Sequence, residues 1–378
     1  MPEKPLYQVN PDRNRPWNEL PELPIHEDLY KTVEVYQQLG RAKEALALLA
    51  GRSVAIPNQA LLVNSITLQE AKDSSAIENV FTTYDDLYQA FSDRKFDDAV
   101  PSSTKEVLRY REAIWKGWEY LEENNGFDIV YFVNLYRAIK EAGDGIRPPF
   151  ARTHIRQGGS GPNAGKRIYT PPKGEGVLEK KLKNLVTFLN DDTIPPEEPL
   201  LKMAIAHFQF EAIHPFRDGN GRAGRILNIH YLTWSALLEL PILYLSRYII
   251  EHKQEYYDRL AAVSQQGAWE EWLQFMLRAV ESTARLTYRK VNDILEAKQE
   301  VLEFLQNNTS FQRPDQLVDA IFTQPFTKVS HLTDDGIYAE NTARSYLNEL
   351  AEMGVLEKRV IKGRHYYQNR ELEEILSY

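Results

Sequence analysis

The stretch HPFRDGNGRAGR, from His214 to Arg225, gathers residue types that can act on a charged substrate. Gly219, Asn220 and Gly221 permit backbone conformations, including positive φ, that bulkier residues resist. They directly precede RAGRILNIHYLTW, which has the apolar pattern of a helix. Because a helix N-terminus presents unpaired N–H groups and a partial positive charge, a glycine-rich turn at this place can hold an anion.

The side chains of the same stretch add a base, a metal ligand and two phosphate ligands. Arg222 and Arg225 lie three residues apart, on one face of the first helical turn, and arginine binds phosphate oxygens with two donors. Asp218 offers the hard oxygen that suits Mg²⁺, and His214 can accept a proton near neutral pH. Each of these residues alone is commonly structural, but together at a helix start they indicate phosphoryl or nucleotidyl transfer.

The segment resembles the signature of the Fic domain family, His-x-Phe-x-(Asp/Glu)-Gly-Asn-Gly-(Lys/Arg)-x-x-Arg, at every specified position. Fic proteins are mostly all-α enzymes that transfer AMP from ATP to a hydroxyl side chain of a target protein. The resemblance extends over roughly residues 60–285. It implies that His214 is the base that deprotonates the target hydroxyl.

The resemblance also implies roles for the rest of the motif. Asp218 would bind Mg²⁺, and Arg222 and Arg225 would bind phosphates. Phe216 would anchor the loop in the core. The anion hole would be formed by Gly219, Asn220 and Gly221, and Asn220 would also orient the transferring phosphate.

A second pattern, SSAIEN, begins at Ser74 on a predicted helix and places Glu78 four residues later, on the same face. Taken alone, such a pair is an ordinary capping or surface pair. It resembles the inhibitory pattern of the Fic family, (Ser/Thr)-x-x-x-Glu-(Gly/Asn), which ends here at Asn79. The resemblance implies that Glu78 pairs with Arg225 and takes the guanidinium away from the γ-phosphate of ATP.

Two further segments resemble elements of the family. ARTHIRQ and the glycines after it resemble the flap hairpin, whose edge could bind a target segment by strand addition. The flap contacts expected here are Ile155, Arg156, Gln157 and Gly158.

EYYDRLAAVS resembles the helix beside the adenine, so that Tyr256 and Tyr257 would stack on or hydrogen-bond the base, although packing explains both nearly as well. Some relatives have Asn where Ser264 aligns.

A metal hydrolase is a further interpretation, with His207, Glu211 and His214 as ligands, but the HExxH pattern is absent. We therefore expect His207 to be a core residue.

Composition limits the class of protein that carries these residues. The 378 residues are 43% hydrophobic and 26% charged, which is ordinary for a globular protein. No cysteine is present, so disulfides and thiol chemistry are excluded. The N-terminus has no apolar signal core, and no run of about 18 apolar residues occurs. We expect a cytoplasmic protein that does not bind membranes.

Helical periodicity predicts a mainly α fold with a small β-hairpin flap. We divide the chain into an N-terminal helical region with the inhibitory helix, residues 1–110, a Fic-type catalytic core, residues 111–290, and a C-terminal winged helix-turn-helix domain, residues 291–378. The last domain is predicted from three short helices followed by two strands around Lys362 and Gly363.

The winged-helix prediction raises the question of DNA binding. From Glu296 to Tyr378, 9 Lys and Arg residues stand against 14 Asp and Glu residues, a difference of −5. Only the wing carries a basic cluster, Lys358, Arg359, Lys362 and Arg364. Weak DNA contact through the wing, homodimerisation and target recruitment all fit this composition.

The resemblance to the Fic family thus implies an adenylyltransferase that uses ATP and Mg²⁺, modifies a Ser, Thr or Tyr hydroxyl of a target protein and of itself, and is autoinhibited by Glu78. Removal of AMP by the same site, with Glu78 as the base for a water, is an alternative within the enzyme class. A DNA-binding regulator whose Fic-like domain senses nucleotide is an alternative from another class.

Overall fold

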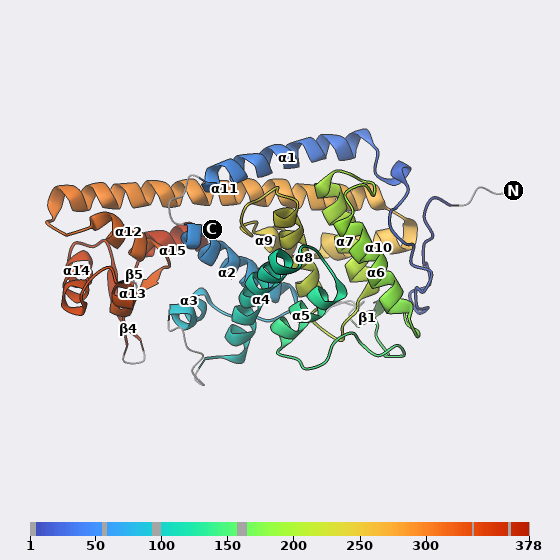
Figure 1. The fold of residues 1–378 in the computed structure, drawn as a ribbon, viewed down its shortest axis with the longest axis horizontal. Coiled ribbons are helices and arrows are strands. Elements are labelled where there is room, and N and C mark those ends of the chain that lie inside the picture. The colour runs from blue at the N-terminus through green and yellow to red at the C-terminus, as the bar shows by residue number, and fades with distance from the viewer. Residues whose placement is uncertain are drawn as a thin grey trace.

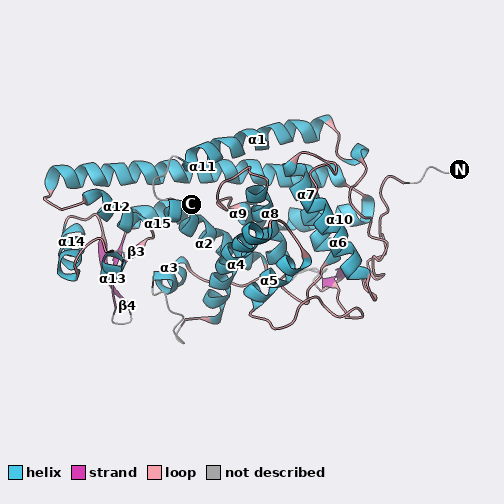
Figure 2. Ribbon diagram, viewed as in Figure 1, coloured by secondary structure: helices cyan, strands magenta, loops and turns pink. Residues whose placement is uncertain are grey.

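The computed structural model describes residues 5–54, 59–92, 100–156, 165–334, 336–361 and 364–377. Helices dominate these residues, and the strands form two small antiparallel sheets (Figure 2), which confirms the predicted mainly α fold. In the described part of the chain, no helix combines the length and hydropathy that crossing a membrane requires.

Two long helices form one side of the molecule. α11 (Trp269–Asn308) runs along its length, and α1 (Val33–Val54) lies beside it (Figure 1). Trp272 of α11 is buried and donates its indole N–H to the Ala204 carbonyl at 2.9 Å. α11 is continuous across the predicted boundary at residues 290 and 291, so the catalytic core and the C-terminal unit are joined by a helix instead of a linker.

The centre of the core is the pair α7 (Pro199–Ile213) and α8 (Asn220–Trp234). α7 is buried around nearly its whole circumference, because α6 (Val177–Asn190), α8 and α11 pack on it. The motif loop connects these two buried helices, which fix both of its ends.

Other helices surround this pair. α2 (Gln59–Ile77) packs on α4 (Ser102–Asn124) and α9 (Leu245–Glu251), and α4 packs on α5 (Ile129–Lys140). The predicted boundary at residues 110 and 111 lies within α4. The remaining elements of this part are η1 (Glu27–Leu29), α3 (Tyr84–Ser92) and α10 (Lys253–Gln266).

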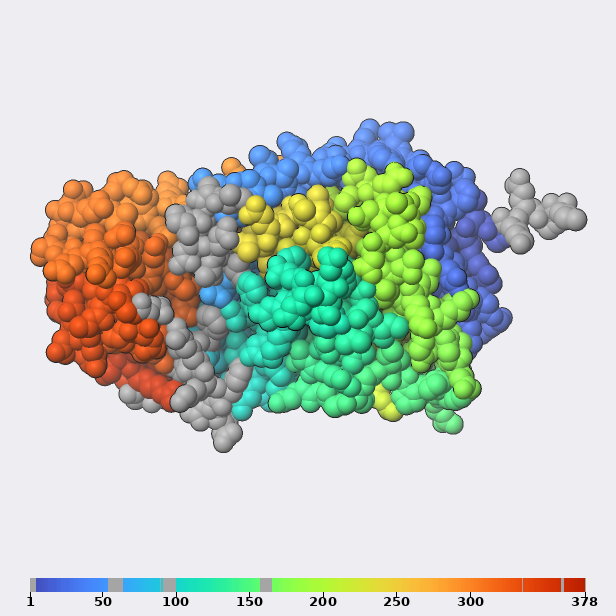
Figure 3. All heavy atoms as spheres, viewed as in Figure 1, coloured from blue at the N-terminus to red at the C-terminus, as the bar shows by residue number. Residues whose placement is uncertain are grey.

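The N-terminal segment is packed against the core at the end of the molecule opposite the C-terminal unit (Figure 3). Trp17 is buried, and its ring meets that of Tyr169 edge-on at 6.1 Å between centroids. Tyr7 meets Trp269 in the same way at 5.4 Å. Aromatic burial of this kind holds an arm that is poor in regular structure.

A short hairpin corresponds to the predicted flap. β1 (Ile155–Arg156) pairs antiparallel with β2 (Arg167–Tyr169), so that Ile155 faces Tyr169 and Arg156 faces Arg167. Gln157 and Gly158, two of the expected flap contacts, lie outside the described residues.

The C-terminal unit contains both strands expected around residues 362 and 363. β4 (Glu357–Ile361) and β5 (Arg364–Gln368) are antiparallel, and β5 also pairs with β3 (Phe326–Thr327) in a sheet of order β3-β5-β4. The helices of the unit are α12 (Pro314–Phe322), α13 (Val329–Asp334), α14 (Glu340–Glu352) and α15 (Arg370–Ser377). The sequence reasoning did not predict β3, α13 or α15.

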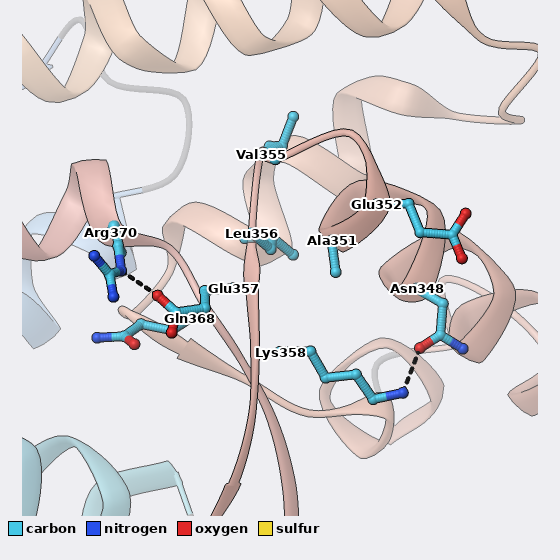
Figure 4. A pocket seen from close by; sticks show the side chains of 10 residues that line it. Asn348, Ala351, Glu352, Val355, Leu356, Glu357, Lys358, Gln368 and Arg370 are labelled. Carbon is cyan, nitrogen blue, oxygen red and sulfur yellow. Dashed lines mark hydrogen bonds and ion pairs between the residues drawn. The ribbon is translucent and has the colours of Figure 1, made fainter.

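The end of α14 and the start of β4 line a surface groove (Figure 4). Across it, Lys358 donates to Asn348 at 2.8 Å, and Arg370 pairs with Glu357. Arg359 also pairs with Glu357, at 3.3 Å. Lys358 and Arg359 of the predicted wing are thus bonded to other side chains of the unit.

A buried lysine attaches the C-terminal unit to α2. Lys290 of α11 is fully buried and donates to the Gln69 side-chain oxygen at 3.1 Å and to the Leu376 carbonyl at 2.7 Å. Burial lowers the pKa of Lys290 to about 8. The last helix of the chain and the helix that carries the SSAIEN pattern therefore share one polar contact.

Candidate functional site

His214 ends α7 in a left-handed conformation, with φ 50° and ψ 60°. Its N–H still donates to the Phe210 carbonyl at 3.0 Å, and its own carbonyl accepts from Arg147 Nε at 2.8 Å. Arg147 is 2% exposed and also donates to the Pro172 carbonyl at 2.6 Å. This arginine, which the sequence reasoning missed, joins the end of α7 to the chain that follows the flap.

The imidazole of His214 is neutral at pH 7. Burial lowers its pKa to about 4, and the Arg147 guanidinium acts in the same direction. A neutral ring keeps one nitrogen lone pair, so it can accept a proton from a hydroxyl.

The motif loop is closed by Asn220. Its side-chain oxygen accepts from the Phe216 N–H at 2.8 Å, and its amide nitrogen donates to the Phe216 carbonyl at 2.9 Å. The Phe216 ring is fully buried and stacks on Tyr136 at 4.5 Å between centroids. Both polar atoms of the Asn220 side chain thus bond to the loop backbone, which explains an asparagine here independently of any phosphate.

Close approach at the start of α8 requires glycine. Gly219 has φ 73°, a conformation that disfavours other residues. A Cβ atom added at Gly221 would stand 2.4 Å from Glu78 Oε1 and 3.0 Å from Arg225 Nη1. The first turn of α8 is therefore packed directly against the end of α2.

Arg225 is 1% exposed and bonds to the end of α2 and to the turn that follows it. Its Nε donates to the Ser74 hydroxyl at 2.7 Å, and its Nη2 donates to the Ser74 carbonyl and to Glu78 Oε1, both at 2.9 Å. Burial acts to lower the pKa of Arg225, but the Glu78 carboxylate together with Tyr256, Tyr110 and Tyr257 raises it by more, so the guanidinium stays charged.

The turn after α2 presents Glu78. The Glu78 N–H bonds to the Ser75 carbonyl and the Asn79 N–H to the Ala76 carbonyl, both at 3.0 Å. Asn79 has φ 62°, in the left-handed region that asparagine tolerates better than most residues. An asparagine after the glutamate thus has a local conformational reason.

Arg222, also 1% exposed, is held by a different helix. Its Nη1 donates at 2.6 Å to Glu106 of α4, and Lys140 at the end of α5 contacts the same carboxylate oxygen at 3.1 Å. Lys140 also pairs with Asp218 Oδ2 at 2.7 Å. The sequence reasoning missed Glu106 and Lys140, since neither belongs to a motif.

Asp218 is the motif residue that fits a divalent cation. Its side chain is 66% exposed. Burial acts to raise its pKa, but the Lys140 ammonium, the Gly219 N–H and Arg222 together lower it by more, so the carboxylate stays ionised. Within the described ranges, no group of three or more His, Asp or Glu side chains could hold a metal by itself. A single carboxylate suits Mg²⁺, which takes its remaining ligands from phosphates and water.

The two adjacent tyrosines have different surroundings. Tyr257 lines a cavity beside the motif, together with the flap residue Ile155, Glu211 and Ser264. Tyr256, in contrast, is 1% exposed and bonds through its hydroxyl to His207 Nε2 at 2.8 Å. Tyr256 therefore belongs to the core, where no ligand reaches it in this conformation.

Three further residues near the motif and the flap lie in different environments. His207 Nδ1 bonds to the Gly224 carbonyl at 3.0 Å, so both of its ring nitrogens are engaged within the core and neither can bind a metal. Arg156 is exposed and donates to the Gly165 carbonyl within the hairpin. Burial raises the pKa of the Glu211 carboxyl to about 8, so this cavity wall is mostly neutral at pH 7.

Comparison with protein-family models decides the family. The Fic/DOC family model matches residues 127–232, which contain the whole motif loop, and the Fic/DOC family N-terminal model matches residues 36–119. The chain belongs to the Fic/DOC family. A third model, described as the C-terminal domain of SoFic-like protein adenylyltransferases, matches residues 299–372. The family resemblance drawn from the motif is thus confirmed.

Curated relatives of this Fic/DOC protein share limited stretches with it. It is 44% identical over 59 residues to the protein adenylyltransferase fic-1 of Caenorhabditis elegans, a match that covers 16% of this chain and 11% of that protein. It is 38% identical over 82 residues to a probable protein adenylyltransferase of Aquifex aeolicus, 21% of this chain and 24% of that protein. The matches thus span a quarter or less of these relatives.

Solved structures show that the Fic/DOC fold extends beyond these stretches. A Fic family protein from Desulfovibrio desulfuricans superposes with a TM-score of 0.54 at 20% identity, over 92% of this chain and 98% of that chain. Fic-1 from C. elegans superposes with a TM-score of 0.51 at 18% identity, over 68% and 72% of the two chains. At these identities the similarity concerns the fold.

Proposed function

We propose that this Fic/DOC protein is a protein adenylyltransferase, which transfers AMP from ATP to a hydroxyl side chain of a target protein and of itself. One observation carries the proposal: a neutral imidazole, His214, lies in the same loop-helix unit as two buried arginines, Arg222 and Arg225. A base beside an anion-binding helix start is what transfer of a phosphoryl-type group needs. The relatives from C. elegans and A. aeolicus are named as a protein adenylyltransferase and a probable one, which agrees with this reaction.

The reaction is a displacement at the α-phosphorus. His214 takes the proton of the target hydroxyl, and the hydroxyl oxygen forms a bond to the α-phosphorus. The bond between that phosphorus and the bridging oxygen of pyrophosphate breaks, so AMP stays on the target and pyrophosphate leaves. Arg222, Arg225 and the backbone of Gly219 to Gly221 bind the phosphate oxygens. Asp218 would hold Mg²⁺, which would supply positive charge to the leaving group.

The cavity at Tyr257 is the proposed site of the adenine. Its wall comes from the flap, α7 and α10, and it is lined mainly by apolar side chains. An aromatic ring and apolar walls suit the faces of a purine. The flap edge at Ile155 and Arg156 is the proposed docking place of the target segment, whose hydroxyl would then face His214.

Glu78 is the proposed inhibitor of this activity. Its carboxylate bonds to Arg225, whose guanidinium is the proposed ligand of the γ-phosphate. A phosphate and a carboxylate compete for the same donors, so ATP is held in a productive position only after Glu78 leaves. Ser74 and Asn79 support the inhibitor, the first by two bonds to Arg225 and the second through its turn.

The test measures which phosphate of ATP is transferred to protein. The full chain is incubated with Mg²⁺ and ATP labelled at the α-phosphate or, in parallel, at the γ-phosphate, and the label on protein is counted. We expect label from the α position only, and a loss of about 100-fold or more in His214→Ala. His26→Ala, at a histidine whose side chain is 51% exposed, is the control that keeps transfer. Equal labelling by His214→Ala at an unchanged melting temperature would refute the mechanism.

The pH dependence gives a second readout of His214. A base must be neutral, and a pKa of about 4 keeps this ring neutral down to about pH 5. Transfer should therefore stay nearly constant as the pH falls from 8 to 6. A histidine with an ordinary pKa of about 6.5 would lose about fourfold over the same range. A loss of that size between pH 8 and pH 6 would contradict a buried neutral base.

A further inference from the structure

Asp218, the proposed metal ligand, already has a partner on each of its oxygens. Oδ1 accepts from the Gly219 N–H at 2.6 Å, and Oδ2 pairs with the Lys140 ammonium at 2.7 Å. The Gly219 contact leaves the charge of the carboxylate available to a cation, because an N–H group is neutral. The Lys140 contact opposes a second cation, because the ammonium already places a positive charge on the same carboxylate.

Lys140 is fixed at this position by its surroundings. It is the last residue of α5, its side chain is 25% exposed, and its Cγ lies 3.3 Å from the place of a Cβ at Gly219. The aliphatic part of the side chain thus packs on the motif turn itself, and its ammonium is directed to the motif carboxylate.

Glu106 holds the other side of the ammonium. Its Oε1 accepts from Lys140 at 3.1 Å and from Arg222 at 2.6 Å. Burial acts to raise the pKa of Glu106, but Arg222 and Lys140 together lower it by more, so the carboxylate stays ionised. Asp218, Lys140, Glu106 and Arg222 therefore form a line of alternating charge that joins the proposed metal ligand to a proposed phosphate ligand.

We propose that Lys140 is an internal counter-ion that competes with the divalent cation for Asp218 and supplies positive charge to a nucleoside triphosphate when no metal is bound. This inference rests on the proposed function. Mg²⁺ needs carboxylate and phosphate oxygens at short range in octahedral geometry, and an ammonium on the same oxygen repels it. When the metal binds, Glu106 remains as an acceptor for the displaced ammonium.

Without Lys140, the dependence of ATP binding on the metal should change. In Lys140→Met, metal-free ATP meets an uncompensated Asp218 carboxylate and binds more weakly, whereas the metal complex of ATP meets no competing ammonium. We expect the ratio of the dissociation constant without metal to that with Mg²⁺ to rise at least about threefold over the parent protein, as for loss of a partly exposed ion pair. Both constants come from one preparation, so a loss of folded protein cancels in the ratio.

The experiment is calorimetric titration of the full chain with ATP in EDTA and in Mg²⁺. It uses the His214→Ala background, so that transfer does not consume the nucleotide. The control is Lys116→Met, because Lys116 is 66% exposed and pairs only with Glu112 among the ion pairs of the described residues. We expect the control to keep the parental ratio. Release of Mn²⁺ from the ATP-bound protein, followed by electron paramagnetic resonance, gives the metal affinity directly and should show tighter binding in Lys140→Met.

The outcomes separate this inference from the function on which it rests. If Asp218→Asn removes the effect of Mg²⁺ but Lys140→Met keeps the parental ratio or lowers it, the metal site stands and the competition is refuted. If Mg²⁺ has no effect that depends on Asp218, or no ATP binds, the proposed metal site or nucleotide site fails and the competition fails with it.

Discussion

Arg222 and Arg225 lie three residues apart on the first turns of one helix, yet they are held by different parts of the molecule. Arg225 makes its contacts with the end of α2, where Glu78 lies in the turn after the helix. Arg222 bonds to Glu106, which lies within α4 and is shared with Lys140. A turn at a helix end can move without disturbing the core, whereas a residue within a packed helix cannot. The first contact is therefore suited to a switch and the second to permanent support.

Of the two sides, the movable one should show the larger effect when its carboxylate is removed. Glu78→Gly frees the Arg225 guanidinium, and a hydrogen bond between charged groups contributes about 1.5–3 kcal/mol, so AMP transfer should rise about 10-fold to 100-fold. The measurement is self-labelling with ATP that carries the label at the α-phosphate. Glu175→Gly, at an exposed turn position, is the control.

An unchanged rate in Glu78→Gly would show that Glu78 does not limit transfer. The same variant also addresses removal of AMP. If Glu78 activates a water, Glu78→Gly should lose turnover of a modified target instead of gaining transfer onto an unmodified one.

Removing the charge on the fixed side should act in the opposite direction. In Glu106→Gln, Arg222 and Lys140 lose a shared anion, so Arg222 is less well positioned and transfer should fall about threefold to tenfold. The free energy of unfolding in urea should fall by about 1–2 kcal/mol, because Arg222 stays buried with a weaker partner. Glu112→Gln is the matched control, on the same helix with a side chain 41% exposed. A rise in transfer would make Glu106 a second inhibitor and would end the distinction between the two sides.

The contacts of Arg225 and those of Arg222 also differ in how far the sequence predicted them. The motif from His214 to Arg225 is contiguous, so its residue types and spacing already indicated a phosphate-binding loop. Glu78 lies 147 residues from Arg225, yet the pattern from Ser74 to Asn79 made it recognisable. Glu106 lies 116 residues from Arg222 and carries no pattern, because a glutamate on an amphipathic helix is most often a solvated charge.

Other differences between the sequence predictions and the structure have equally local causes. Helical periodicity cannot decide which of two adjacent tyrosines faces a cavity, and the structure puts Tyr257 there and Tyr256 on His207. Asn220 was expected to orient a phosphate, but its amide closes the loop on Phe216, a contact that depends on the positions of both helices. In the C-terminal unit, β3 is two residues long and α13 six, too short for a periodic pattern to reveal.

The smallest predicted effect concerns the turn that presents Glu78. Asn79 has φ 62°, and a left-handed conformation costs an alanine about 1 kcal/mol more than an asparagine or glycine. Asn79→Ala should therefore weaken the contact between Glu78 and Arg225 and raise self-labelling about twofold to fivefold. Asn79→Gly, which adopts this φ freely, should stay near the parental rate. Activation of Glu78→Gly without any change in Asn79→Ala would mean that the bonds of Ser74 to Arg225, and not the turn, set the strength of the contact. If both Asn79 variants are activated equally, the asparagine side chain itself supports Glu78, and the conformational argument is wrong.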